Sequence, residues 1–380
     1  MGTSINVLTV NAGSSSIKLA LFSVGSSDSL PVRILQDSAT NIDHSSAITA
    51  MLDKLADTMR EHTVSAICHR IVHGGPKYGR PQIITDEFKR ELRELERFDP
   101  VHTPAAVSLI DALSLRFPDT IQVACFDTAF FHDVPRMAQI IPLPHSYEAH
   151  GLRRYGFHGL SYTYLLSAFR QKAGEVAADG RVIFAHLGSG ASLAAIKGGK
   201  PVDMTMGFTP ASGVMMSTRS GDVDPGIEWY LQRQAGIDSE AYNHMVNFES
   251  GLLGVSGLSG DMLNLLQNEA GNERAAEAVS LFCYQVKKSI GALAATLGGL
   301  DSLVFSGGIG EQAPAIRERI CSGLDFLGIQ LDGASNDNQA DLISAAQSKV
   351  GVHVMPTDES LVMAQQTFDL VSKTSTGNGE

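Results

Sequence analysis

The hydrophobic and polar positions of the chain form short strand-like runs that alternate with longer helix-like stretches. Residues 7–22 form an apolar run, a turn of small residues and a second, alternating run, which predicts two strands joined by a tight turn. Amphipathic stretches at residues 45–62 and 103–117 alternate with apolar runs at residues 66–72 and 121–126. Strands that alternate with helices predict the α/β class, in which helices cover β-sheets.

The strand–turn–strand unit occurs twice. Residues 7–22 (VLTVNAGSSSIKLALF) align with residues 182–197 (VIFAHLGSGASLAAIK), so that Gly13 lies over Gly188. This repeat predicts two similar lobes, each opening with a β-hairpin whose turn points into a cleft. The length of 380 residues agrees with two lobes, because a domain holds roughly 100 to 200 residues.

A third glycine turn follows the apolar run at residues 303–306. The segment SGGIGEQAPAIRERI leaves this predicted strand and enters a helix with Pro314 near its start. A strand, a glycine turn and a helix N-terminus in succession are typical of phosphate or nucleotide binding.

Composition excludes several classes of protein. The formal charge of −12 without a basic tract argues against a nucleic-acid partner. The four cysteines have no C-x-x-C spacing, which argues against a zinc site and a disulfide framework. No signal-like start and no apolar run of about 18 residues occurs, so we expect a cytoplasmic protein without a membrane segment.

Phosphoryl transfer needs backbone amides that approach phosphate oxygens, cations, and carboxylates that organise magnesium. The turn NAGSSS, with Asn11 and Lys18 nearby, offers amides and hydroxyls, although a plain serine-rich hairpin would look the same. The chain has no G-x-x-x-x-G-K-[ST], no G-x-G-x-x-G and no G-x-S-x-G, so a Walker, Rossmann or hydrolase interpretation is unsupported.

Five charged or titratable residues stand in settings that favour a site. Arg70 (HRIVHGG) and Arg219 (MMSTRSGDVDPG) lie among glycines and suit bidentate contact with carboxylate or phosphate, or structural salt bridges. His158 in RYGFHG could donate to a phosphoryl group or be a satisfied buried histidine. Asp127 follows a buried strand, and Glu359 begins a predicted helix; both suit magnesium, and Glu359 also suits a helix N-terminal charge.

Eight ordered motifs together resemble the acetate kinase family: VNAGSSSIK, HRIVHGG, FDTAFF, RYGFHG, HLGSGAS, MGFTPASGVMMSTRSGDVDP, SGGIGE and PTDES. The match runs from residue 10 to about residue 368. The resemblance implies the two-lobed sugar-kinase, Hsp70 and actin-like (ribonuclease H-like) α/β fold with duplicated mixed sheets. The expected lobes are residues 1–131 with 361–380, where the C-terminal helix returns, and residues 132–360, which would bind nucleotide and form a homodimer.

The activity implied by the resemblance is reversible, direct in-line transfer of the ATP γ-phosphoryl group to acetate, giving acetyl phosphate and ADP. The implied catalytic residues are Arg70, Asp127, His158 and Arg219, with both arginines holding the acyl phosphate. Asn11 and Glu359 would hold Mg²⁺, for which Mn²⁺ could substitute. His102 and His186 fall at the remaining motif histidines.

The resemblance also implies two binding sites. The acid would be bound by Arg70 and an apolar pocket of Val72, Val101, Phe157 and Pro210. ATP or ADP would be bound by Lys18, His186, Gly188, Ser189, Gly190, Asp261, Met262, Leu263, Gly308, Ile309, Gly310 and Gln312. Val101 replaces a larger leucine, and apolar pockets discriminate one methylene by only about 1 to 3 kcal/mol, so propionate or butyrate remain alternatives.

Departures from the family pattern cluster on the nucleotide side. Ser189 and Gln312 replace asparagines and Leu263 replaces an arginine, while Thr103, Leu160 and Tyr162 alter motifs nearer the acid. Losing a cation removes a contact worth about 1.5 to 3 kcal/mol, so we expect an active kinase with a loosened nucleotide site. A different phosphoryl donor such as pyrophosphate, or a non-catalytic nucleotide-binding relative, are the competing interpretations.

Overall fold

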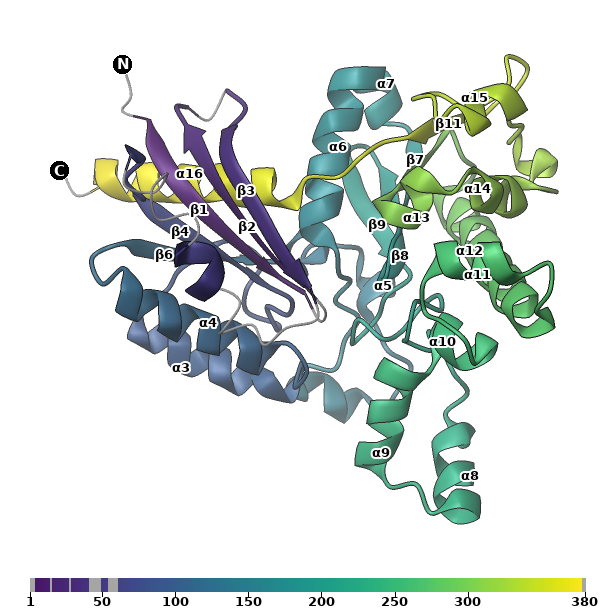
Figure 1. The fold of residues 1–380 in the computed structure, drawn as a ribbon, viewed down its shortest axis with the longest axis horizontal. Helices are drawn as coiled ribbons and strands as arrows, with labels where there is room; N and C mark the ends of the chain where they lie inside the picture. The colour runs from purple at the N-terminus through teal and green to yellow at the C-terminus, as the bar shows by residue number, and fades with distance from the viewer. Residues whose placement is uncertain (1–3, 14–15, 27–28, 41–48, 54–60, 378–380) are drawn as a thin grey trace. The chain divides into compact units, whose positions relative to one another are not determined.

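The computed structural model describes residues 4–13, 16–26, 29–40, 49–53 and 61–377 (Figure 1). The chain divides into two compact units, and the statements below concern their described residues. Unit 1 comprises Met1–His132, Gly159–Tyr164 and Asp358–Glu380, and unit 2 comprises Asp133–His158 and Leu165–Thr357. Nothing in the sequence pattern indicates the short return of Gly159–Tyr164 to unit 1.

Unit 1 is built on a six-stranded mixed sheet in the order β3–β2–β1–β4–β6–β5. Its strands are β1 (Ile5–Ala12), β2 (Ser16–Val24), β3 (Val32–Thr40), β4 (Ala66–Ile71), β5 (Gln82–Ile83) and β6 (Ile121–Phe126). Strand β1 pairs antiparallel with β2 and parallel with β4, and β4 pairs parallel with β6. The carboxyl ends of β1, β4 and β6 therefore lie at one edge of the sheet.

Unit 2 repeats this plan in a five-stranded sheet of order β11–β10–β7–β8–β9. Its strands are β7 (Arg181–Leu187), β8 (Ala191–Lys197), β9 (Lys200–Met204), β10 (Ser302–Ser306) and β11 (Gly351–Val354). Strand β7 pairs antiparallel with β8 and parallel with β10, as β1 does with β2 and β4. The duplication predicted from the two hairpins is confirmed, and so is the mixed α/β class.

Both faces of the unit 1 sheet are covered. On one face α16 (Glu359–Gly377) packs Met363 and Phe368 against a cluster that contains Val7. On the other face α4 (Thr103–Arg116) packs Leu113 against a cluster that contains Leu8. Because successive strand residues point to opposite faces, the largely apolar sequence of β1, buried from Val7 to Asn11, is the kind expected for a strand covered on both sides.

The remaining helices follow from local signals. They are α3 (Asp86–Glu94), α5 (Arg136–Gln139), α6 (Gly159–Ala173), α7 (Glu175–Ala178), α8 (Gly226–Ala235), α9 (Ser239–His244), α10 (Gly251–Ser256), α11 (Met262–Asn268), α12 (Glu273–Leu297), α13 (Gly307–Gln312), α14 (Pro314–Cys321) and α15 (Gly333–Asp337). The longest, α12, begins where Asn272 accepts a hydrogen bond from the Ala275 amide and ends at Gly298 in the left-handed region.

One expectation changes in detail. The glycine turn after β10 does not enter the next helix directly; it forms the short helix α13, and α14 starts separately at Pro314. The break falls at Ala313, because a residue before proline is disfavoured in the helical region. The helix expected over residues 45–62 lies mostly outside the described residues. In the described part of the chain, no helix is long and apolar enough to span a bilayer.

Candidate functional site

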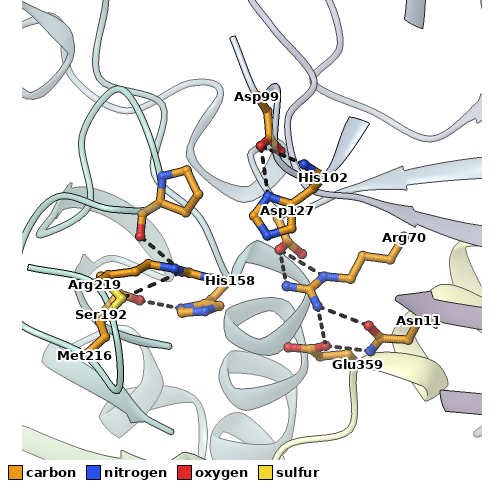
Figure 2. Close-up of polar contacts among 11 residues, drawn as sticks. Asn11, Arg70, Asp99, His102, Asp127, His158, Ser192, Met216, Arg219 and Glu359 are labelled. Atoms are coloured by element: carbon orange, nitrogen blue, oxygen red, sulfur yellow. Dashed lines mark hydrogen bonds and ion pairs between the residues drawn. The ribbon is translucent and has the colours of Figure 1, made fainter. Parts of the chain in front are cut away.

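One polar cluster lies at the strand ends of unit 1 (Figure 2). Arg70, at the end of β4, donates from Nε and Nη2 to Oδ2 of Asp127, which follows β6, at 3.0 and 2.6 Å. Its Nη1 donates to Oδ1 of Asn11 at the end of β1 (3.1 Å). Asn11 donates from Nδ2 to Oε2 of Glu359, the first residue of α16 (2.7 Å). The sheet topology thus brings together four residues that lie far apart in sequence.

The Arg70–Asp127 ion pair is held away from water. The side chain of Asp127 is 1% exposed and that of Arg70 is 14% exposed. Burial alone disfavours the Arg70 charge, but Asp127 and Glu359 raise the pKa of Arg70 above its ordinary value. Burial raises the pKa of Asp127, while the charge of Arg70 opposes that rise. Removing either partner of such a pair costs about 3 to 5 kcal/mol, because it leaves a buried charge uncompensated.

The same unit contains a carboxylate–imidazole pair that the sequence analysis did not single out. Oδ1 of Asp99 accepts from Nδ1 of His102 at 2.8 Å and from the His102 backbone amide at 3.2 Å. His102 is the N-cap residue of α4. The D-x-x-H spacing was a usable signal, since an acid three residues before a histidine can reach both of these groups.

A second cluster belongs to unit 2 and centres on His158 (Figure 2). Its Nδ1 lies 2.8 Å from Oγ of Ser192, and its ring stacks on that of His186 with centroids 4.5 Å apart. The His158 backbone has φ 59°, a left-handed conformation shared by only one other non-glycine residue of the described chain, Gln339. Non-glycine residues held in such strained backbone conformations cluster at active sites, ligand clamps and switch regions.

The second hairpin turn approaches His158 through a glycine. A Cβ at Gly190 would lie 3.0 Å from Nε2 of His158 and 3.7 Å from Nη1 of Arg219. A Cβ at Gly188 would lie 3.9 Å from the backbone nitrogen of Gly308. The β7–β8 turn, His158, Arg219 and the start of α13 therefore converge within unit 2, and glycine permits the close approach.

Arg219 is held by its own loop. Its Nη1 donates to the carbonyl oxygen of Pro210 (3.2 Å) and lies 3.7 Å from Sδ of Met216. The Met216 amide in turn donates to the Arg219 carbonyl oxygen (3.0 Å). These contacts fix the guanidinium beside Gly190.

The other predicted site residues fall on both units. Lys18 is exposed on β2, directly opposite Asn11. Of the predicted pocket residues, Val72 and Val101 belong to unit 1, and Phe157 and Pro210 belong to unit 2. Each of these four is buried or half-buried.

The predicted nucleotide residues of unit 2 are linked through the backbone. The Ser217 amide donates to the Ser189 carbonyl oxygen (3.0 Å), and a Cβ at Gly260 would meet the Ser217 oxygen at 2.9 Å. Asp261 follows and caps α11, while Met262 is buried and Leu263 is 64% exposed. Ile309, Gly310 and Gln312 lie on α13.

The oxygen atoms of unit 1 suit a hydrated magnesium ion. Asn11, Asp127 and Glu359 offer carboxylate and amide oxygens, and Oδ1 of Asp127 is buried without a hydrogen-bond partner in the described structure. No group of three or more His, Cys, Asp or Glu side chains among the described residues is arranged to hold a metal directly. Oxygen ligands are the kind that Mg²⁺ prefers, and the ion usually keeps several of its waters. His69 lies near this cluster in sequence but pairs with Gln122, and burial lowers the pKa of His69 to about 4.

Arg317 supports the site and could not be identified from sequence. Its side chain is fully buried, and Nη1 donates to the carbonyl oxygens of Gly310 and Glu311, both at 2.8 Å. Nε and Nη2 donate to Oδ1 and the carbonyl oxygen of Asn336 at 2.9 and 2.8 Å. In the sequence it reads as one charge of an ordinary surface helix, AIRERI.

Comparison with known proteins identifies a family. The model of the acetokinase family matches residues 34–365. A protein of Rhodopseudomonas palustris (strain TIE-1) named acetate kinase is 41% identical, over 96% of this chain and 98% of its own. The structure resembles the crystal structure of Porphyromonas gingivalis acetate kinase, with TM-score 0.83 and 36% identity over 97% and 100% of the two chains. It also resembles a propionate kinase from Francisella tularensis, with TM-score 0.85 and 32% identity over 95% and 98%.

Proposed function

Because the chain belongs to the acetokinase family, we propose that it acts as an acetate kinase. It transfers the γ-phosphoryl group of ATP to acetate and gives acetyl phosphate and ADP, and it also catalyses the reverse reaction. The observation that carries the proposal is the network in which Arg70 joins Asp127, Asn11 and Glu359. These are four residues to which the family resemblance assigns chemistry.

Arg70 and Arg219 hold the two anionic substrates in this proposal. A guanidinium offers a planar fork of donors that matches carboxylate and phosphate oxygens. The pKa of Arg70 is raised by Asp127 and Glu359 despite its burial, so Arg70 stays charged throughout the working pH range. Asp127 fixes the plane of the Arg70 guanidinium through two hydrogen bonds, which orients the donors that remain for substrate.

His158 stabilises the transferring phosphoryl group. The contact between its Nδ1 and Ser192 leaves Nε2 facing the position where a Cβ at Gly190 would lie. Charge spreads over the phosphoryl oxygens during in-line transfer, so a preorganised donor there lowers the barrier. No phosphoenzyme is required.

The unit 1 cluster would hold the magnesium ion that phosphoryl transfer from ATP needs. Asn11 and Glu359, with Asp127 nearby in the network, would hold Mg²⁺ through its waters, and Mn²⁺ would substitute. When bound, the ion neutralises charge on the β- and γ-phosphates. The nucleotide-binding residues are those of the β7–β8 turn, of α11 and of α13, with Lys18.

A propionate kinase is the second candidate. It is favoured by the likeness to the Francisella tularensis propionate kinase and by the small side chain of Val101. A pocket that differs by one methylene separates the two acids by only about 10- to 200-fold.

The test is acyl phosphate formation, trapped as the hydroxamate, with acetate, propionate and butyrate against ATP, GTP and pyrophosphate. Acetate with ATP is expected to be fastest, to require Mg²⁺ and to stop with a chelator. Arg219→Ala is expected to abolish product. A faster rate with propionate would support the second candidate, and no product with any pair would refute the kinase assignment.

We further propose that the protein is cytoplasmic and forms a homodimer through unit 2. Trp229 and Tyr230 on α8 are 60% and 57% exposed, and Phe248 after α9 is 39% exposed. Exposed aromatic side chains of this kind favour an interface. Light scattering coupled to size exclusion is expected to give twice the chain mass for the wild type and the single chain mass for Trp229→Glu. A monomeric wild type would refute the dimer.

A further inference from the structure

Asp99 is a buried carboxylate whose hydrogen bonds go to one residue. Its side chain is 3% exposed, and Oδ1 accepts both hydrogen bonds, one from the ring and one from the backbone amide of His102. The second oxygen, Oδ2, is buried and has no partner among the described residues. Among the described residues, the Asp99 side chain accepts hydrogen bonds from His102 alone, and unlike a helix cap that bonds only a backbone amide, it also holds the ring.

The pairing decides which ring nitrogen of His102 remains available. Burial alone would raise the pKa of Asp99, but the hydrogen bonds from His102 together with the nearby His102 and His73 rings lower it, so the carboxylate is ionised and can only accept. Nδ1 of His102 therefore carries a proton that it donates to Oδ1. The two bonds to a single oxygen also fix the ring relative to its own backbone, and Nε2 is the nitrogen left to meet another group.

His102 belongs to the charged cluster of unit 1. The pKa of Asp127 is set first by burial, Arg70 and Glu359, and a charge on the His102 ring lowers it further. The charge of Asp99 in turn helps to raise the pKa of Arg70. His102 also follows Val101, a residue of the proposed acid pocket. The ring is therefore held next to groups that, in the proposed function, receive the acid.

We propose that Asp99 is a positioning residue that holds His102 so that Nε2 faces the carboxylate of the acid substrate, as part of the proposed kinase reaction (Figure 2). Asp99 touches no substrate and acts through His102. When Nε2 carries a proton, it donates to the acid, and Asp99 balances the charge of the ring.

A double-mutant cycle tests this proposal. Asp99→Ala and His102→Ala are each expected to lower kcat/KM for the acid about 10- to 100-fold, mostly through KM for the acid, with KM for ATP little changed. In the His102→Ala background, Asp99→Ala is expected to lower kcat/KM for the acid by less than about a further threefold, because the effects of residues that act as a unit are not additive. Circular dichroism and thermal unfolding confirm that each variant is folded.

Two further variants and a spectroscopic readout support the cycle. Asp99→Asn keeps the side-chain volume and serves if the alanine variant does not fold. It is expected to lower kcat/KM for the acid at least about threefold, and this loss is expected to disappear in the His102→Ala background. Asp332→Asn, which removes an exposed acidic helix cap in unit 2, serves as the control and is expected to change nothing. In ¹⁵N spectra, the His102 signals, assigned by their absence in His102→Ala, are expected to show a protonated Nδ1 in the wild type and a tautomer change in Asp99→Ala.

The proposal is overturned if Asp99 variants lower kcat/KM for the acid by the same factor with and without His102, or do not lower it. An unchanged His102 tautomer in Asp99→Ala would also overturn it. Failure of the kinase assignment itself looks different, since the wild type would then form no acyl phosphate.

Discussion

Replacing Arg317 by methionine is expected to weaken unit 2 and its nucleotide turn together. The guanidinium is fully buried, makes four hydrogen bonds and has no carboxylate partner among the described residues. Burial lowers the pKa of Arg317, the nearby Cys321 and Asp337 oppose that fall, and carbonyl and amide oxygens accept the guanidinium protons. Arg317→Met leaves the Gly310, Glu311 and Asn336 oxygens without their donor, at about 1 to 3 kcal/mol for each buried group.

The buried methionine recovers part of this loss, since burying such a side chain contributes about 1.5 to 3 kcal/mol. Summed over the four acceptor oxygens, the lost hydrogen bonds cost about 4 to 12 kcal/mol, so the expected net cost is at least about 1 kcal/mol, and centrally several kcal/mol, of the free energy of unfolding of unit 2. Because α13 loses the ties at its C-terminal end, KM for ATP is expected to rise while KM for the acid stays constant. Urea unfolding followed by circular dichroism measures the first effect, with transitions fitted separately because a two-unit chain need not unfold in one step.

Arg319→Met is the matched control on the same helix. Arg319 forms a two-bond ion pair with Glu269 at 2.7 and 2.6 Å, but its side chain is 39% exposed. Ion pairs that water can screen contribute about 1 kcal/mol or less. An equal loss of stability in both variants would refute the argument from burial, and an unchanged KM for ATP in Arg317→Met would refute the link to the nucleotide turn.

Three other predictions follow from single contacts. Gly190→Ala places a methyl group 3.0 Å from Nε2 of His158 and is expected to lower kcat about 10- to 100-fold with little loss of stability. The control Gly291→Ala in α12 meets open space, so it is expected to leave kcat unchanged and to stabilise the chain by about 0.5 to 1 kcal/mol. Leu263→Arg is expected to lower the Kd for ATP at least about tenfold by calorimetry, and no change would refute a loosened nucleotide site caused by this residue. The pKa of His69 falls from 6.5 to about 4 on folding, so between pH 6.5 and 4 the unfolded chain binds a proton that the folded chain does not. The free energy of unfolding is therefore expected to fall by about 3 kcal/mol as the pH drops from 6.5 to 4, and His69→Gln is expected to flatten that part of the plot of stability against pH.

Much of the fold could be predicted because the hairpin repeat fixes a sheet topology. An antiparallel pair followed by a parallel strand recurs as β2–β1–β4 and β8–β7–β10, and the apolar runs predicted the bounds of these six strands and of β6 to within two residues. The edge strands β3, β5, β9 and β11 were not predicted. The return of Gly159–Tyr164 to unit 1 leaves no such pattern, since α6 runs on through Ala173 while its first residues pack with a different unit.

The site was predictable where its chemistry required rare residue settings. Arg70 and Arg219 stand among glycines, and Asp127 follows a buried strand, so local context marks them. Asp99 left a usable signal in its D-x-x-H spacing. Arg317 left none, because its role depends on which segment lies opposite, and charged residues on helices look alike in sequence whether they are exposed or buried. Ser192 is likewise an unremarkable strand residue until the structure places it against His158.

The two copies of the hairpin sheet have come to supply different chemistry. Asn11 of β1 aligns with His186 of β7, and Arg70 on β4 bonds to Asn11, whereas the residue paired with His186 on β10 is Ser306. The position that carries a buried cation in unit 1 is therefore neutral in unit 2 and is followed by Gly307 and Gly308. Charged side chains suit substrates that need fixed counter-charges, and glycine amides suit phosphates that approach the backbone. One duplicated scaffold thus fits an enzyme that must bind an acid and a nucleotide at once.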